Sequence, residues 1–439
     1  MRVAVVASGS MGDVRPYAML AGAFAEAGWD AGLVTNDGYA GLAQTFGLGW
    51  FAPALPTLER VKAWQRRQNA QQASLFDSDL WDDWFAHYPA LLQSLAGAHV
   101  IVSRIPWIAD MARMLDIPFV MAANLPLDGV RADLPRVRTA AAIRPMVARR
   151  RLLAGVPGAV SALNLLSHAG GVAEHVALLW RERRNLGALY GLQGRHRTTL
   201  AALADDPARQ RLASPVPPLV SAVALSPAIL PARSNERFTG IWRRPEPAYQ
   251  PTPALARLLG AGPPIVYVGF GSVPCMPDGS DFSALSAVVA EAVHQAGVRV
   301  IITGGWGGLN WPGPPDDARA IVVGDVPHDW LFPRVDAIVH HCGVGTTMAA
   351  LAAGRPSVPV PFLQDEPFWA WRLQELGVAP PPLDPTRITA AALATALRRA
   401  VRDPTMQARA AALGDAIRAE DGLGAVVQLA TQALKEAER

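Results

Sequence analysis

Short apolar runs alternate with helical patterns at the start of the chain. Residues 2–7 (RVAVVA) are typical of a buried strand, and a Gly/Ser turn, SGSMGD, follows them. The pattern becomes helical at Pro16, and we expect this helix to end at Gly28, before a second strand over DAGLVT. This order predicts a βαβ unit with a right-handed crossover between parallel strands.

The same alternation begins again at residue 264. PIVYVGFGS predicts a strand that ends in small residues, and a helix is expected over about residues 282–296. After residue 389 only helical patterns follow. Such an order predicts parallel α/β layers. Further strands are expected at VRVIITGG, AIVVGDV, DAIVHH and VPVPF, with a helix over about residues 365–376.

Two stretches between these regions, 214–220 and 227–253, are rich in proline and arginine and lack periodicity, which is typical of a linker.

A chain of 439 residues that is 51% hydrophobic can build two or three domains with their own cores. The predicted fold class is α/β, with two doubly wound, Rossmann-like domains facing across a cleft. Ligands are expected at the carboxyl ends of the strands. The predicted units are an N-terminal domain over 1–225, a linker over 226–262, a C-terminal domain over 263–415, and a last helix over 416–439 that packs back toward the N-terminal domain.

Composition excludes several classes of protein. No apolar run approaches the roughly 18 residues that a transmembrane helix needs, and the apolar run at the N-terminus is too short for a signal peptide. Two cysteines, Cys275 and Cys342, cannot form a disulfide framework, and their spacing from the histidines does not fit a zinc site. We therefore expect a cytoplasmic protein.

Arginines gather between Arg131 and Arg151, although the formal net charge is only +3. One interpretation is a solvated loop and helix face. The other is a basic patch for peripheral contact with lipid headgroups or for an acidic acceptor. Nucleic acid is not an expected partner, because aromatic residues do not alternate with these arginines.

The segment 341–347 (HCGVGTT) lies between a predicted strand and a predicted helix. Gly343 and Gly345 would let backbone N–H groups approach a ligand, and Thr346 and Thr347 could cap the helix and offer hydroxyls. A helix N-terminus favours an anion, and His341 could donate a hydrogen bond to a phosphate oxygen. The alternative is a capped turn with a buried structural histidine. The spacing matches neither the dinucleotide fingerprint nor the P-loop.

HCGVGTT resembles the core of the box that marks plant secondary-product glycosyltransferases. The surrounding segment from VGDVPHDW to LQELGVAP is similar to sterol glucosyltransferases and glycopeptide-antibiotic glycosyltransferases, and so are GSMGDVRPY, LSPAILP, VYVGFGSV and ITGGWGGL. The resemblance runs from residue 1 to about residue 400 and is weak over 55–215. It implies the GT-B fold, an N-terminal domain that binds the acceptor, and a C-terminal domain that binds a nucleoside diphosphate sugar.

The resemblance also implies roles for individual residues of the C-terminal domain. His341 matches the histidine that contacts the donor diphosphate, and the glycines and threonines after it match the phosphate-binding loop. Asp365 and Glu366 match an Asp-Gln pair that binds sugar hydroxyls, and the glutamate could alter the choice of sugar because an ionised carboxylate only accepts hydrogen bonds. The implied donor-binding residues are Gly271, Ser272, Val326, His328, His341, Gly343, Gly345, Thr346, Thr347, Asp365 and Glu366.

Two positions depart from the plant relatives. Asp325 stands where they have a stacking tryptophan, and Ala349 stands where they have a glutamate that binds ribose.

Asp13 is the candidate catalytic base. It follows Gly12 in the first β–α turn, where glycopeptide and sterol relatives also have an aspartate. Transfer with inversion needs a stabilised diphosphate leaving group, an aligned acceptor and a group that takes the acceptor's proton. The alternative is that Asp13 only caps the helix that follows.

No metal is expected to be required, because the phosphate loop can stabilise the leaving group. The only Asp-x-Asp, Asp77-Ser78-Asp79, precedes a helical pattern, which favours helix capping.

Aromatic residues between 60 and 92 recur at helical spacing and predict a core face. The alternative is that they form the wall of a pocket for a flat hydrophobic acceptor. They are Trp64, Phe76, Trp81, Trp84, Phe85 and Tyr88.

The predicted function is an inverting, metal-independent hexosyl transfer from a UDP- or dTDP-sugar to a hydroxyl or amine of a hydrophobic natural product, sterol or lipid. No cofactor beyond the donor is expected. The alternatives are a nucleotide-sugar epimerase of the same fold and a non-catalytic relative that only binds the donor. A nicotinamide dehydrogenase is disfavoured because SGSMGD lacks the full glycine fingerprint.

Overall fold

The computed structural model describes most of the chain outside one long central segment. The predictions for Phe76, for Asp77 and for the arginines between Arg131 and Arg151 lie outside the described residues, as do those for the side chains of Ser78, Asp79, Trp81 and Phe85. The described ranges are 1–69, 78–105, 108–109, 111–112, 115–123, 220–230, 237–244, 249–314, 317–362 and 365–438.

The N-terminal domain is built on a parallel sheet. Within the described ranges its strand order is β3-β2-β1-β4-β5-β6-β7. Residues 3–6 of the central strand β1 are fully buried, as expected for a parallel strand covered on both faces. The strands are β1 (Arg2–Val6), β2 (Asp30–Val34), β3 (Trp50–Ala52), β4 (Val100–Ser103), β5 (Phe119–Ala123), β6 (Val220–Val223) and β7 (Arg237–Phe238). The helices are α1 (Met11–Glu26), η1 (Asp37–Tyr39, a 3-10 helix), α2 (Ala40–Thr45), α3 (Leu58–Asn69) and α4 (Ser78–Leu95).

The first helix begins five residues earlier than the sequence pattern predicted. Ser10 is its N-cap, and Pro16 lies inside the helix. The prediction from Pro16 was wrong because the pair Ser10 and Asp13 starts the helix: the Asp13 carboxylate accepts the Ser10 backbone N–H at 2.9 Å. Asp13 therefore lies in the first turn of α1, shortly after the carboxyl end of β1.

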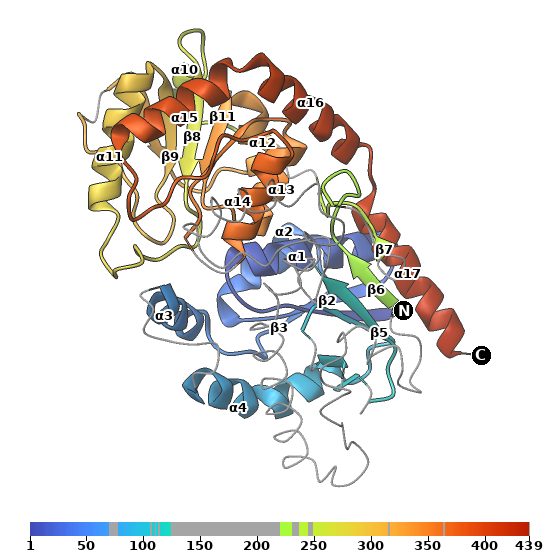
Figure 1. Cartoon of the computed structure of the whole chain (residues 1–439). Coiled ribbons are helices and arrows are strands. Elements are labelled where there is room, and N and C mark those ends of the chain that lie inside the picture. Colours follow the sequence, from blue (N-terminus) through green and yellow to red (C-terminus); the bar gives the residue numbers. More distant parts are fainter. Residues whose placement is uncertain are drawn as a thin grey trace, which may run out of the picture.

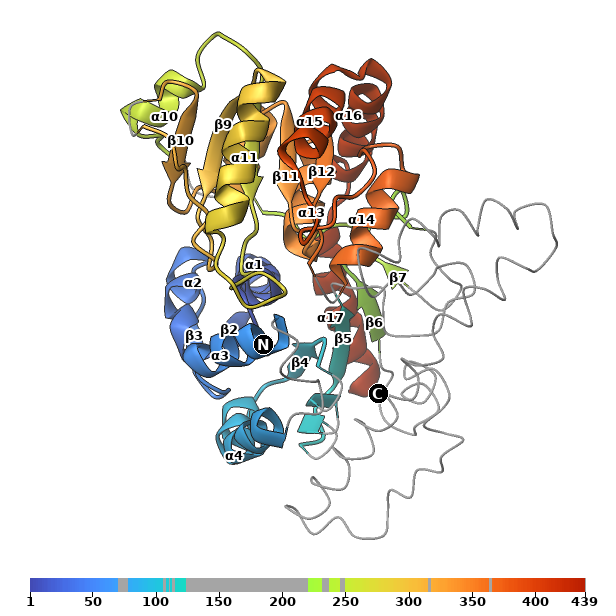
Figure 2. The same cartoon turned by 60° about the vertical axis from the view of Figure 1, so that its left-hand side comes forward.

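The C-terminal domain has a second parallel sheet, with strand order β10-β9-β8-β11-β12 in the described part of the chain. Helices pack on both faces of this sheet, and the whole domain lies above the first domain in Figures 1 and 2. The strands are β8 (Ile265–Gly269), β9 (Arg299–Thr303), β10 (Ala320–Val323), β11 (Ala337–His340) and β12 (Ser357–Pro359). The helices are α10 (Pro253–Leu258), α11 (Ser283–Ala296), α12 (His328–Leu331), η2 (Phe332–Arg334, a 3-10 helix), α13 (Val344–Ala352), α14 (Glu366–Glu375), α15 (Ala390–Arg402) and α16 (Pro404–Arg418).

The chain crosses between the two domains twice. After β6, residues 225–230 pack on the second domain, where Ile229 and Leu230 share a buried cluster with Trp369 and Trp371 of α14. The last helix, α17 (Gly422–Ala437), returns to the first domain and runs beside β5 and β6 (Figure 1). Two crossings hold the carboxyl ends of the two sheets opposite each other.

Helix α3 also bridges the two domains. The Lys62 ammonium lies 5.4 Å from the ring centroid of Trp306, which follows β9. The Cys275 thiol, in the loop after β8, lies 4.0 Å from the carbonyl oxygen of Arg66. Of the predicted aromatic wall, Trp84 and Tyr88 are buried in the core beneath the first sheet, so these two residues form a core face.

Candidate active site

The first turns of α1 and α13 meet at the interface between the domains. A Cβ built on Gly345 would lie 3.8 Å from the Cα and the carbonyl oxygen of Gly12. Both turns follow the carboxyl end of a strand, β1 in one domain and β11 in the other. Parallel sheets place their ligand sites at such ends. The predicted phosphate loop and the predicted base are therefore close together, although they are far apart in sequence.

The turn between β11 and α13 has an unusual backbone. Cys342 has a φ of 70°, in the left-handed region that residues other than glycine seldom adopt. Its N–H donates to Nδ1 of the buried His340 at 3.1 Å, which leaves the proton of the neutral imidazole on Nε2. Burial raises the pKa of the Cys342 thiol, so it stays protonated and is not a nucleophile.

His341 is held between two glycines. A Cβ on Gly271 would lie 2.8 Å from its Cε1, and a Cβ on Gly343 would overlap its Nε2. The imidazole is buried, and its Nδ1 has no hydrogen-bond partner among the residues that the structure describes. Burial lowers the pKa of His341 to about 4, with a smaller contribution from His328. The ring is therefore neutral near pH 7 and has an unused polar atom.

The N-terminus of α13 has no side-chain cap. Gly343 is the N-cap residue, in an extended conformation. Capping by Thr346 and Thr347 was a wrong prediction, because the helix begins at Val344 and both threonines lie inside its first turns. Thr347 is fully buried, and its hydroxyl has no partner among the described residues. The N–H groups of the first turn have no intrahelical acceptor, so they are suited to an anion.

A second glycine turn lies beside His341. Gly271 has a φ of 55°, and its carbonyl accepts the Trp306 N–H at 3.0 Å. A Cβ on Gly305 would overlap that same carbonyl. The turns after β8 and β9 therefore pack closely together, and Ser272 follows a glycine that lies against His341 of the predicted phosphate loop.

Val326 and His328 lie at the start of α12, at the end of β10. Val326 is buried. The His328 ring stacks on Phe332 with centroids 4.2 Å apart and lies edge-on to Tyr267. Burial lowers the pKa of His328 to about 4, with a further contribution from Arg15 of the other domain. The ring therefore forms a neutral, stacked surface near pH 7.

The side chains of Asp365 and Glu366 accept hydrogen bonds from different partners. Asp365 precedes α14 and accepts the Trp369 indole N–H at 3.0 Å. Burial raises its pKa to about 6, and the charge of Asp13 adds to the rise. Glu366 is buried, and its Oε2 accepts the backbone N–H of Phe362 at 2.6 Å. The glutamate therefore holds its own loop, a role that its place in the sequence did not reveal.

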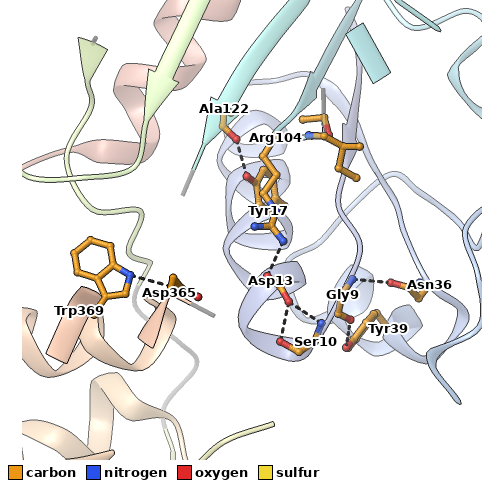
Figure 3. A network of polar contacts seen from close by, with 12 residues as sticks. Gly9, Ser10, Asp13, Tyr17, Asn36, Tyr39, Arg104, Ala122, Asp365 and Trp369 are labelled. Carbon is orange, nitrogen blue, oxygen red and sulfur yellow. Dashed lines mark hydrogen bonds and ion pairs between the residues drawn. The ribbon is translucent and has the colours of Figure 1, made fainter. Parts of the chain in front are cut away.

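Asp13 lies at the domain interface and accepts three hydrogen bonds from residues that the structure describes. Its Oδ2 accepts both the N–H and the hydroxyl of Ser10, each at 2.9 Å. Its Oδ1 accepts Nη2 of Arg104 at 2.6 Å (Figure 3). Asp365, the residue before α14, lies on the side of α1 that carries Asp13 (Figure 3). Sequence reasoning missed Arg104, and the available signal was its position directly after the strand Val100–Ser103.

Neither a metal site nor a membrane span is found in the described part of the chain. Its histidine, cysteine and acidic side chains form no group of three that could hold a metal ion. None of its helices is both long and apolar enough to cross a bilayer.

A known domain family matches the C-terminal part of the chain. Residues 313–431 match the family described as Erythromycin biosynthesis protein CIII-like, C-terminal domain. The matched segment is similar to this domain family. It contains the predicted phosphate loop, α13 and the pair Asp365 and Glu366.

Curated glycosyltransferases are similar to about half of the chain. An O-mycaminosyltylonolide 6-deoxyallosyltransferase of Streptomyces fradiae is 36% identical over 218 residues, which cover 49% of each chain. A vancomycin aglycone glucosyltransferase of Amycolatopsis orientalis is 37% identical, over 48% of this chain and 50% of the relative. A sterol 3-beta-glucosyltransferase of Arabidopsis thaliana is 37% identical, over 41% of this chain and 27% of the relative. The chain thus matches half or less of the length of these relatives, and the predicted resemblance is confirmed.

Solved glycosyltransferases share the whole fold. The glycosyltransferase of kitacinnamycin superposes with a TM-score of 0.64 at 17% identity, over 99% of both chains. The spinosyn forosaminyltransferase SpnP gives 0.63 at 17% identity, also over 99% of both. The glycosyltransferase VinC, solved with dTDP, gives 0.58 at 18% identity over 100% of both. These likenesses confirm the predicted GT-B fold, which the two domains form together.

Proposed function

We propose that this chain is an inverting glycosyltransferase that moves a sugar from a nucleoside diphosphate sugar to a hydrophobic small molecule. The observation that carries the proposal is the neutral His341, whose unpartnered Nδ1 lies beside the uncapped N-terminus of α13. A diphosphate would supply the acceptors that both features lack. Relatives named for antibiotic aglycones and sterols support a lipophilic acceptor, and a neighbour solved with dTDP supports a UDP- or dTDP-sugar.

In the proposed reaction the acceptor oxygen bonds to the anomeric carbon while the bond from that carbon to the diphosphate breaks. The diphosphate leaves with the electron pair and is stabilised by His341 and the first turn of α13. The acceptor proton goes to Asp13, which lies in the opposing domain. Because the leaving group is stabilised by fixed hydrogen-bond donors, the proposal assigns no step to a metal.

The remaining donor contacts follow from the positions of the other residues. Gly271 and Ser272 are proposed to line the phosphates, and Val326 and His328 the nucleobase. Asp365 is proposed to accept a sugar hydroxyl, since its partial burial leaves a carboxylate oxygen near the interface. Glu366 is proposed to act indirectly, by fixing the loop at Phe362. Two free cysteines fit a reducing compartment, so we also propose a cytoplasmic location.

A donor panel tests the proposed function. The purified chain is heated with UDP- and dTDP-sugars, and a ligand at 100 times its Kd should stabilise the fold by about 2.7 kcal/mol. The best donor is then incubated with sterol, polyketide and phenolic acceptors, and products are identified by mass spectrometry. A glycosylated acceptor with an inverted anomeric centre is the expected result.

The other outcomes separate the alternatives. Conversion of the donor into a sugar epimer without any acceptor would favour the epimerase. Donor binding without transfer to any acceptor class and without donor hydrolysis would favour a non-catalytic relative. No stabilisation by any nucleotide sugar would contradict the proposed donor site itself.

A further inference from the structure

The Asp13 carboxylate uses its two oxygens differently. Oδ2 accepts two hydrogen bonds from Ser10, which occupy both of its lone pairs. Oδ1 accepts one hydrogen bond, from Arg104. Among these contacts, Oδ1 alone keeps a lone pair for the proton of an acceptor.

Arg104 is held in place by the turn that carries it. The preceding residue, Ser103, is fully buried at the end of β4. Its hydroxyl donates to the Val6 carbonyl at 2.9 Å and accepts the Ile105 N–H at 3.0 Å. These bonds fix the turn after β4 against the end of β1, so the guanidinium reaches Asp13 from a rigid base. About three-quarters of each side chain of the ion pair is buried, with 25% of Arg104 and 26% of Asp13 exposed.

We propose that Arg104 is a positioning residue for the base: it orients the Asp13 carboxylate so that Oδ1 receives the acceptor proton, and it balances the negative charges of Asp13 and Asp365. This inference rests on the proposed function and adds a residue that neither the sequence nor the family resemblance assigned.

Three charged or titratable side chains influence Asp13 from the described elements around it. Asp365, ahead of α14, is a second carboxylate, and the repulsion between the two raises the pKa of Asp365. Arg104 acts in the opposite direction on Asp365. Tyr39 is the third: burial and the charge of Asp13 raise the pKa of its phenol, which stays neutral and donates to the Gly9 carbonyl at 2.9 Å. Arg104 is therefore the cation that offsets the two carboxylates.

The charge balance matters at the moment of transfer. When the acceptor oxygen bonds to the anomeric carbon and the diphosphate departs with the electron pair, the acceptor proton moves to Oδ1. A fixed cation beside Oδ1 then favours release of this proton to water, which restores the carboxylate for the next turnover. Without the cation, Asp365 would lose an interaction that lowers its pKa, and the repulsion between the two carboxylates would not be offset.

The test compares Arg104→Gln, Arg104→Lys and the wild-type chain. Arg244→Gln is the matched control. Arg244 forms an ion pair with Glu26, the last residue of α1, whereas Arg104 pairs with Asp13 in the first turn of that helix. The pH dependence of kcat and kcat/KM for the acceptor is measured from pH 5 to 9, and donor Kd by calorimetry. Arg104→Gln should move the acid limb of kcat/KM upward by about one to three pH units. Arg104→Lys should restore most of that shift, and donor Kd should change less than about threefold in both variants.

Two outcomes would overturn the inference. One is an Arg104→Gln profile with the same acid limb as the wild type and as Arg244→Gln. The other is an equal loss of donor binding in Arg104→Gln and Arg104→Lys, because this would assign Arg104 a structural role only. A wild-type chain that transfers no sugar at any pH would instead overturn the proposed function, and with it the basis for the inference on Arg104.

Discussion

At the scale of single residues, the position of Asp13 is compatible with both roles that the sequence posed as alternatives. It closes the first turn of α1 through Ser10, and it faces the second domain, where the proposed reaction needs a base. An acidic residue in the first turn is also favoured by the helix dipole. The two roles are compatible because different oxygens of the carboxylate serve them.

Replacing Asp13 should separate these roles. Asp13→Asn keeps an oxygen for Ser10 but cannot take a proton at neutral pH, so kcat should fall by about 10²–10⁴ while donor Kd stays the same. Asp13→Ala should lose as much activity and, in addition, about 1 kcal/mol of unfolding free energy, because the capping interaction is lost. Steady-state kinetics, calorimetry and urea unfolding measure these effects. Unchanged kcat in Asp13→Asn would remove Asp13 from the mechanism.

Asp365 should make donor binding depend on pH. Its pKa of about 6 means that the carboxylate is ionised at pH 7 and mostly protonated at pH 5. If the donor sugar binds the ionised form, donor Kd should rise roughly tenfold from pH 7 to pH 5. Calorimetry at steps of half a pH unit measures this, and Asp365→Asn should bind weakly with a flat profile. A wild-type Kd that does not change over this range would exclude the contact.

The same shift fixes the sign of a stability effect. Because the pKa of Asp365 is raised in the folded chain, the folded state holds a proton between about pH 4 and pH 6 that the unfolded chain has already released. The free energy of unfolding of the wild type should therefore fall, relative to Asp365→Asn, as pH rises through this window. Urea unfolding of both proteins at pH 4.5 and pH 7 is the measurement.

At the scale of elements, the uncapped start of α13 is the feature on which the proposed function depends. Its glycine at the N-cap leaves the first-turn N–H groups without a competing side chain. The same glycine leaves space for the His341 ring, since a Cβ there would overlap Nε2. Glycine at position 343 thus serves two purposes: it leaves the N-terminus of α13 uncapped, and it makes room for the His341 ring.

Gly343→Ala should weaken donor binding by tenfold or more. The added methyl group must displace the imidazole, and overpacking of this kind costs about 1–3 kcal/mol. Gly41→Ala in α2 is the control, because a Cβ there meets nothing within 4 Å. Calorimetric titration of both variants with the best donor gives the comparison, and equal affinities would show that the ring position does not matter.

At the scale of the whole molecule, α17 ties the end of the chain to the first domain. Leu423, Val426 and Ala430 are buried in the same cluster as Val5 of β1. The hydroxyl of Ser226 donates to Glu420 at 2.6 Å, just before this helix. The first domain is therefore completed by the last helix of the chain, which links the two domains together with the segment after β6.

Leu423→Ala should lower the free energy of unfolding by about 2–5 kcal/mol, because it leaves a cavity in the core of the first domain. The control is Glu436→Ala, an exposed residue of the same helix, which should change the value by less than about 0.5 kcal/mol. Urea unfolding monitored by tryptophan fluorescence measures both. Equal stabilities would show that α17 does not contribute to this core.

The amino-acid sequence by itself determined most of the elements and the local make-up of the predicted phosphate loop. Strands β1, β8 and β11 and helices α11 and α14 follow from local apolar patterns, because burial on both faces of a parallel sheet requires continuous apolar runs. HCGVGTT indicated an anion site for the same local reason: the glycines, the histidine and the helix start are all neighbours in sequence. The start of α1 was misplaced because a proline within the helix outweighed the Ser10–Asp13 pair in that prediction.

Tertiary structure decided how the candidate site is completed. Arg104 meets Asp13 across 91 residues of sequence, through the pairing of β4 with β1, and no local pattern encodes that pairing. The packing of His341 against Gly271 depends in the same way on the pairing of β8 with β11. Local periodicity reports which residues are buried, whereas the partner of a buried polar group is set by strand order and by the contact between domains.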